Sequence, residues 1–112
     1  MIKVKVDRIH PTQFVVGQKE VEFLYDKVDE ILESEKSERK AGLKEQAGKV
    51  VIGPGGELYL TEGHHHGKAL SDRRAKWMFV TVEQDWSNLS EKEFWKRMSG
   101  VTLGRKRTHF RI

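Results

Sequence analysis

The first third of the chain shows two different hydrophobic periods. Ile2 to Val6 alternate apolar residues with lysines, which is the two-residue period of a strand with one buried face. From about Gln18, apolar residues recur at helical spacing, at Val21, Leu24, Val28, Ile31 and Leu32. Pro11 lies between the two patterns and provides no amide donor for a ladder. The pattern predicts a strand, a break near Pro11 and a long amphipathic helix.

The middle of the chain contains a charged segment and a turn. Residues 34–47 are rich in charge and have few core residues, so we expect an insert that is either a mobile loop or an exposed helix docked by Ala41, Leu43 and Ala47. Two short apolar runs, 49–52 and 57–60, flank a Gly-Pro-Gly-Gly segment, which favours a tight reversal. These runs are predicted to form a hairpin.

A strand and a helix are predicted in the last third. Residues 76–82 are aromatic and β-branched, which is typical of a strand. Ser90 and Glu93 form a capping box for a helix that we expect to end at Gly100. The whole order is β, α, insert, β-hairpin, short α, β, α and a basic tail at 101–112. This order predicts one α/β domain over residues 1–112.

The composition is that of a folded protein. The chain has 112 residues, 37% of them hydrophobic and 34% charged, which allows one core but not two ordinary ones. No apolar run approaches the roughly 20 residues of a membrane span, and the N-terminus lacks a signal-peptide core. We therefore expect a cytoplasmic protein with no membrane partner. The oligomeric state is left open.

Charge and the absence of cysteine narrow the chemistry. Without cysteine there is no thiol nucleophile and no thiolate metal ligand, so histidines, carboxylates and hydroxyls remain. The net charge is +4, and residues 96–111 hold six bases and no acid. We expect part of this tail to bind nucleic acid, although a solvated surface explains it equally well. The candidate nucleic-acid-binding residues are Arg105, Lys106, Arg107 and Arg111.

The strongest candidate site is the segment Thr61 to Leu70, TEGHHHGKAL. A helix that follows a strand directly exposes unpaired backbone amides and the positive end of its dipole, which can hold a phosphate or carboxylate. Gly63 would let the backbone approach this anion closely. The three histidines offer phosphate donors, an acid or base near neutral pH, or metal ligands. Metal binding is the weaker alternative, because successive helical residues point about 100° apart, and each ring taken singly could also be a packing residue.

The same segment resembles a known signature. "Strand, [DE]-G-H-H-x, helix" is similar to the D-G-H-H-R or D-G-H-T-R box of the ParB/sulfiredoxin superfamily. The upstream residues Pro11-Thr12-Gln13, Val16-Gly17 and Glu20-Val21 resemble the P-T-Q..VG..EV pattern of the putative ParB-like nuclease family, and the helix around Glu93-Phe94-Trp95 extends the likeness over most of the chain.

The resemblance implies a small mixed sheet with flanking helices, in which the turn and the early helix border a cleft for a phosphorylated ligand. Carried over residue by residue, it matches Gly63, His64 and His65, while Glu62 replaces the usual Asp and His66 stands where the motif has Arg. The loss of Arg removes a bidentate phosphate donor, for which Lys68 or Arg73 can compensate. The resemblance and the chemistry together nominate His64, His65, Glu20 and Glu62 as catalytic residues, and Gly63, His64, His65, His66, Lys68 and Gln13 as phosphate-binding residues.

Two classes of function fit these residues. The first is an enzyme, a nuclease or a phosphotransferase or phosphohydrolase, in which Glu20 or Glu62 orients a histidine or holds Mg²⁺. The second is a non-catalytic module that binds nucleotide or nucleic acid, with Trp86 as the exposed tryptophan and Trp77 and Trp95 in the core. Sulfiredoxin chemistry is excluded because it needs a cysteine. The 42 residues after Leu70 also leave no room for the helix-turn-helix domain of a partition protein.

Overall fold

The computed structural model describes residues 1–13 and 16–103 of the chain. Five strands form one mixed sheet in the order β1-β5-β3-β4-β2. The strands are β1 (Ile2–Lys5), β2 (Ile9–His10), β3 (Gly48–Ile52), β4 (Leu58–Glu62) and β5 (Trp77–Asp85). The helices are α1 (Gln18–Glu33), α2 (Lys36–Glu45), α3 (His64–Asp72) and α4 (Glu91–Leu103), with short 3-10 turns η1 (Val6–Arg8) and η2 (Pro54–Gly56).

The centre of the sheet joins segments that are distant in the sequence. β3 pairs antiparallel with β4 through the turn at η2, as predicted, and parallel with β5 on its other side. β1 adds antiparallel to β5, and the two-residue β2 adds parallel to β4. The mixed sheet with flanking helices is therefore confirmed. The sequence pattern did not reveal β2, because two residues next to Pro11 are too short to show a period.

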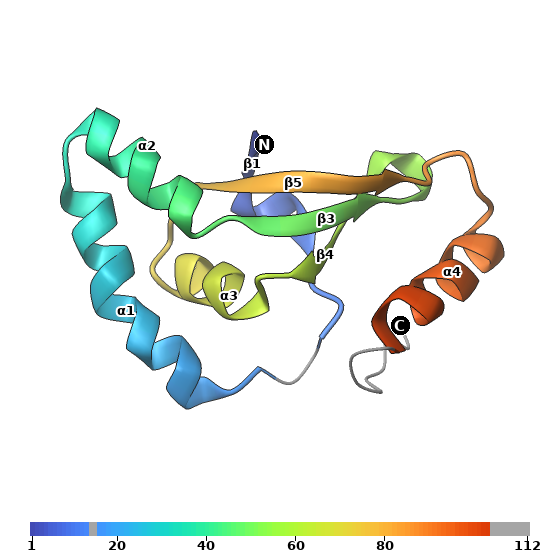
Figure 1. Cartoon of the computed structure of the whole chain (residues 1–112), viewed down its shortest axis with the longest axis horizontal. Helices are drawn as coiled ribbons and strands as arrows, with labels where there is room; N and C mark the ends of the chain where they lie inside the picture. Colours follow the sequence, from blue (N-terminus) through green and yellow to red (C-terminus); the bar gives the residue numbers. More distant parts are fainter. Residues whose placement is uncertain (14–15, 104–112) are drawn as a thin grey trace.

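Two clusters of buried side chains hold the helices on this sheet. In Figure 1, α1, α2 and α3 lie together at one end of the molecule, and α4 lies at the other. The larger cluster joins Val21 and Val28 of α1 with Leu70 of α3 and with sheet residues such as Met78. The smaller cluster joins Phe94 and Met98 of α4 with Val51, Tyr59 and their neighbours. α3 thus lies between α1 and the sheet and packs on both through its buried residues Ala69 and Leu70.

The structure decides between two alternatives for one segment and corrects the predicted end of one helix. The charged segment at 34–47 forms a helix, α2, and Leu43 docks it with only 6% of its surface exposed. α4 does not end at Gly100 but continues to Leu103, because a glycine inside a helix costs only about 1 kcal/mol relative to alanine and does not stop it. Ser90 caps this helix as expected, since its Oγ accepts the amide of Glu93 at 3.1 Å.

No helix in the described part of the chain is both long enough and apolar enough to cross a membrane.

Candidate functional site

The turn between β4 and α3 is shaped by a glycine that no other residue could replace without strain. Gly63 has a φ of 92° and forms the N-cap of α3. A Cβ at this position would lie 2.9 Å from the Cα of Gly48, so a side chain would also meet the backbone of β3. Two glycines therefore allow β4 to turn into α3 while staying against β3.

The first turn of α3 presents backbone amides without a side-chain cap. Gly63, the N-cap residue, has no side chain to bond the N-terminal amides of this helix, and the first helical bond runs from Gly67 N–H to Gly63 O at 2.8 Å. The amides of His64, His65 and His66 precede that bond and belong to the helix end that carries partial positive charge. This geometry suits an anion.

His64 points inward from this turn and is held by Thr12. Only 6% of its surface is exposed. Its Nε2 accepts the backbone N–H of Thr12 at 3.2 Å, with the Thr12 hydroxyl 3.3 Å away, and that hydroxyl donates to the carbonyl of Leu60 at 2.6 Å. Because Nε2 is the acceptor, the neutral ring carries its proton on Nδ1. His64 therefore connects α3 to the segment between β2 and α1.

The other two histidines leave the helix in different directions. His65 is half-buried and borders an open depression of about 390 Å³ together with Gln13, Glu62 and Gly63. His66 instead contacts Gln46, the buried residue that follows α2, through its Nδ1. Burial, with a smaller effect of the nearby His65, lowers the pKa of His66 and favours its neutral form. We call the depression beside His65 the turn depression.

A deeper cleft adjoins the turn depression and shares Gln13 and His64 with it. This cleft, which we call the α3 cleft, has a volume of about 340 Å³. Its apolar wall includes Leu60 and Met78, and its polar groups are Gln13, His64, Lys68 and Ser71. An apolar cavity with a few convergent polar groups is typical of a small-molecule or substrate site.

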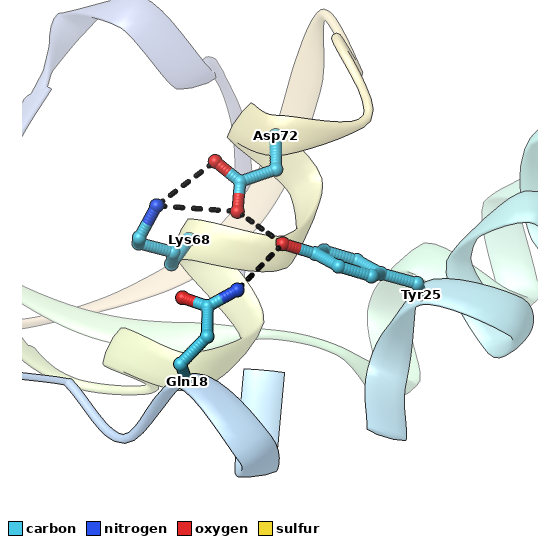
Figure 2. Close-up of polar contacts among 4 residues, drawn as sticks. All are labelled: Gln18, Tyr25, Lys68 and Asp72. Carbon is cyan, nitrogen blue, oxygen red and sulfur yellow. Dashed lines mark hydrogen bonds and ion pairs between the residues drawn. The ribbon is translucent and has the colours of Figure 1, made fainter. Parts of the chain in front are cut away.

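A polar network joins α1 and α3 and includes Lys68 of the α3 cleft (Figure 2). Lys68 Nζ lies 3.0 Å from Asp72 Oδ1, and the Tyr25 hydroxyl donates to Asp72 Oδ2 at 2.6 Å. Gln18 Nε2 in turn donates to the Tyr25 hydroxyl at 3.3 Å. The hydrogen bond from Tyr25, more than the nearby cations, lowers the pKa of Asp72, and Asp72 raises the pKa of Lys68. Lys68 therefore stays charged at the cleft but already has a carboxylate partner.

The two candidate carboxylates occupy different places. Glu62 borders the turn depression and lies 3.6 Å from Lys49 Nζ. Glu20 lies in the first turn of α1, with its carboxylate against Gly17, and lines neither the turn depression nor the α3 cleft. Within residues 1–13 and 16–103, no three His, Asp or Glu side chains form a group that could hold a metal ion.

The structure brings together Gln13, Glu62, Gly63, His64 and His65, and it places Lys68 at the adjoining cleft. Glu20 and His66 lie apart from this group. The four candidate residues of the basic tail, Arg105, Lys106, Arg107 and Arg111, lie outside the described residues.

Sequence reasoning missed three residues of the site. Thr12, which holds His64, stood in the matched P-T-Q motif, so the motif could have indicated it. Tyr25 and Asp72 had no such signal, because they meet across 47 residues of sequence.

Known proteins resemble this chain in sequence and in fold. The family model described as "Putative ParB-like nuclease" matches residues 2–104. Among solved structures, protein Atu1540 from Agrobacterium tumefaciens is 30% identical in sequence, with a TM-score of 0.70. The match covers 88% of this chain and 46% of that one, so the chain spans about half the length of this relative. No curated protein matches the sequence. Because the family model covers nearly the whole chain, the protein belongs to the putative ParB-like nuclease family.

Proposed function

We propose that the protein hydrolyses a phosphodiester bond of a nucleic acid or nucleotide whose phosphate lies in the turn depression. One observation carries the proposal: the turn depression and the α3 cleft share Gln13 and His64 at the N-terminus of α3. A phosphate at the helix end would be stabilised by the backbone amides and the dipole, while the attached nucleoside could enter the apolar cleft. Membership of a nuclease-like family supports the same substrate class.

In this proposal the histidines have separate roles. His65 is half-buried at the turn depression, so it is the acid–base candidate, accepting a proton from water as the water oxygen attacks phosphorus and the bond to the leaving oxygen breaks. His64 is a positioning residue, because its Nε2 is already engaged by Thr12. Gln13, at both cavities, can donate to a phosphate oxygen, and Lys68 provides a positive charge at the cleft.

In this proposal, Glu62 would hold Mg²⁺ at the turn depression. Mg²⁺ is commonly held by one or two carboxylates together with substrate phosphates, so a group of three protein ligands is not required. Glu62 is the carboxylate at the turn depression, and Lys49 already partly neutralises it. Bound there, Mg²⁺ would neutralise charge on the phosphate.

Turnover of bis(p-nitrophenyl) phosphate and of a labelled DNA strand, with Mg²⁺ or with EDTA, tests the proposal. His65→Gln should lower kcat by about 10²–10⁴-fold, the usual contribution of a positioned acid or base. His66→Gln is the matched control, because it changes the adjacent histidine, which contacts Gln46 outside the depression. Equal loss in both variants would contradict the role of His65. Ligand binding by the parent chain without any turnover would instead identify a non-catalytic nucleotide- or nucleic-acid-binding module.

A further inference from the structure

A basic groove lies along β1, away from α3. It has a volume of about 340 Å³, and Lys3, Lys5, Arg8 and Trp77 line it together with Glu57. We call it the β1 groove. All three cations are exposed, and in residues 1–13 and 16–103 none of them forms an ion pair.

The acidic group in the β1 groove already has a partner. The carboxylate of Glu57 lies 2.6 Å from His10 Nε2, which leaves the three cations without a competing anion of their own. A groove of this charge favours a polyanion, because each phosphate that it neutralises releases condensed counterions.

An aromatic ring forms part of the same groove. Trp77 is half-buried, not part of the buried core as its sequence position indicated, because it begins β5 and pairs only with the short edge strand β1. Lys3 Nζ lies 4.7 Å from the centre of its ring. A basic groove that contains an aromatic ring is typical of proteins that bind single-stranded nucleic acid, where bases stack and phosphates meet cations. In a duplex, the bases are already stacked on each other.

A third hollow lies between the β1 groove and the α3 cleft and shares lining residues with each. Lys5 also lines a hollow of about 240 Å³, which contains Lys76 and one exposed acid, Asp7. This hollow shares Val6 and Ser71 with the α3 cleft. The β1 groove, this hollow, the α3 cleft and the turn depression therefore follow one another as neighbours that share lining residues.

From the cations without an ion pair, the aromatic ring and this series of neighbouring hollows, we propose that the β1 groove binds single-stranded nucleic acid and guides it toward the α3 cleft. The direction of guidance rests on the proposed function, whereas the binding itself does not.

Fluorescence anisotropy with a labelled thymidine strand of about 12 nucleotides tests the binding. The triple variant Lys3→Gln, Lys5→Gln and Arg8→Gln should reduce the slope of log K against log salt by about 2, since each phosphate contact on a single strand contributes about 0.7. At about 0.1 M salt this corresponds to a loss of affinity of up to about 100-fold. The parent chain should also bind this strand more tightly than the matching duplex or inorganic polyphosphate.

The matched control removes three positive charges elsewhere. Lys36→Gln, Lys40→Gln and Lys92→Gln change exposed residues of α2 and α4 by the same net charge. If both triple variants lowered the affinity for the strand equally, the effect would be one of net charge, and the β1 groove would not be the binding site. Equal affinity of the parent for strand, duplex and polyphosphate would overturn the recognition of single strands.

The two proposals can fail separately. If His65→Gln abolishes cleavage while the β1 triple variant keeps full affinity for the strand, only the groove is wrong. If no phosphodiester is cleaved but the β1 triple variant still loses affinity selectively, the groove stands and the proposed catalysis is wrong. The β1 triple variant should hydrolyse bis(p-nitrophenyl) phosphate at the parent rate, because this small substrate does not reach the groove.

Discussion

Replacing Gly63 with alanine tests how the turn before α3 is built, and the structure gives the size of the effect. At a φ of 92°, an L-residue pays about 1–2 kcal/mol for the left-handed conformation. The new Cβ would also lie 2.9 Å from Gly48 Cα, and because both partners are backbone, neither can rotate away. Overpacking of this kind costs about 1–3 kcal/mol, so we expect a total of about 2–5 kcal/mol.

Gly55→Ala separates the two contributions. Gly55 also has a positive φ, of 77°, but a Cβ there would have no atom of the described residues within 4 Å. Gly55→Ala should therefore lower the free energy of unfolding only through the strained backbone conformation, by about 1–2 kcal/mol. Urea unfolding of both variants and the parent, followed by circular dichroism, gives the two differences in free energy. If Gly63→Ala were no more destabilising than Gly55→Ala, the close approach of β4 to β3 would not limit this turn.

Two further predictions concern the groups whose pKa values are shifted. Because the folded state lowers the pKa of His66, the contribution of this residue to the free energy of unfolding should be fully present above about pH 6.5 and should be lost as the pH falls toward the folded pKa. Urea titrations at several pH values should show this loss in the parent and not in His66→Gln. Equal pH dependence in both proteins would contradict the prediction. Tyr25→Phe removes the main cause of the lowered pKa of Asp72, so NMR titration should find a higher pKa for this carboxyl group. The variant should also lose about 1 kcal/mol of unfolding free energy near neutral pH, and this loss should shrink in acid. An unchanged Asp72 titration would mean that the hydrogen bond is absent in solution.

Local patterns predicted those parts of the fold that depend on nearby residues. The hairpin of β3 and β4 follows from two apolar runs around a glycine-rich turn, and α1 follows from its apolar stripe. The short helix α3 was predicted to follow a strand directly within the segment Thr61 to Leu70, as it does. In each case a few adjacent residues determine both the element and its boundary.

Long-range pairing could not be predicted in the same way. The parallel pairing of β3 with β5 brings together segments separated by α3. The sequence of one strand does not identify the strand with which it pairs. The same limit applies to the site. His64 and Thr12 are 52 residues apart, so the sequence could nominate His64 but could not show that its Nε2 is occupied. Glu20 was nominated from a motif, whereas its position depends on how α1 meets the turn before it.

The three adjacent histidines are best understood from the helix that carries them. Consecutive residues at a helix start point about 100° apart, so neighbouring rings cannot share one environment. His64 therefore turns inward to Thr12, His65 borders the turn depression, and His66 reaches Gln46 beside α2. The rings of His64 and His66 connect α3 to other segments, which holds the first turn in place, while the ring of His65 borders the depression. A substitution at one histidine should consequently not be compensated by its neighbours.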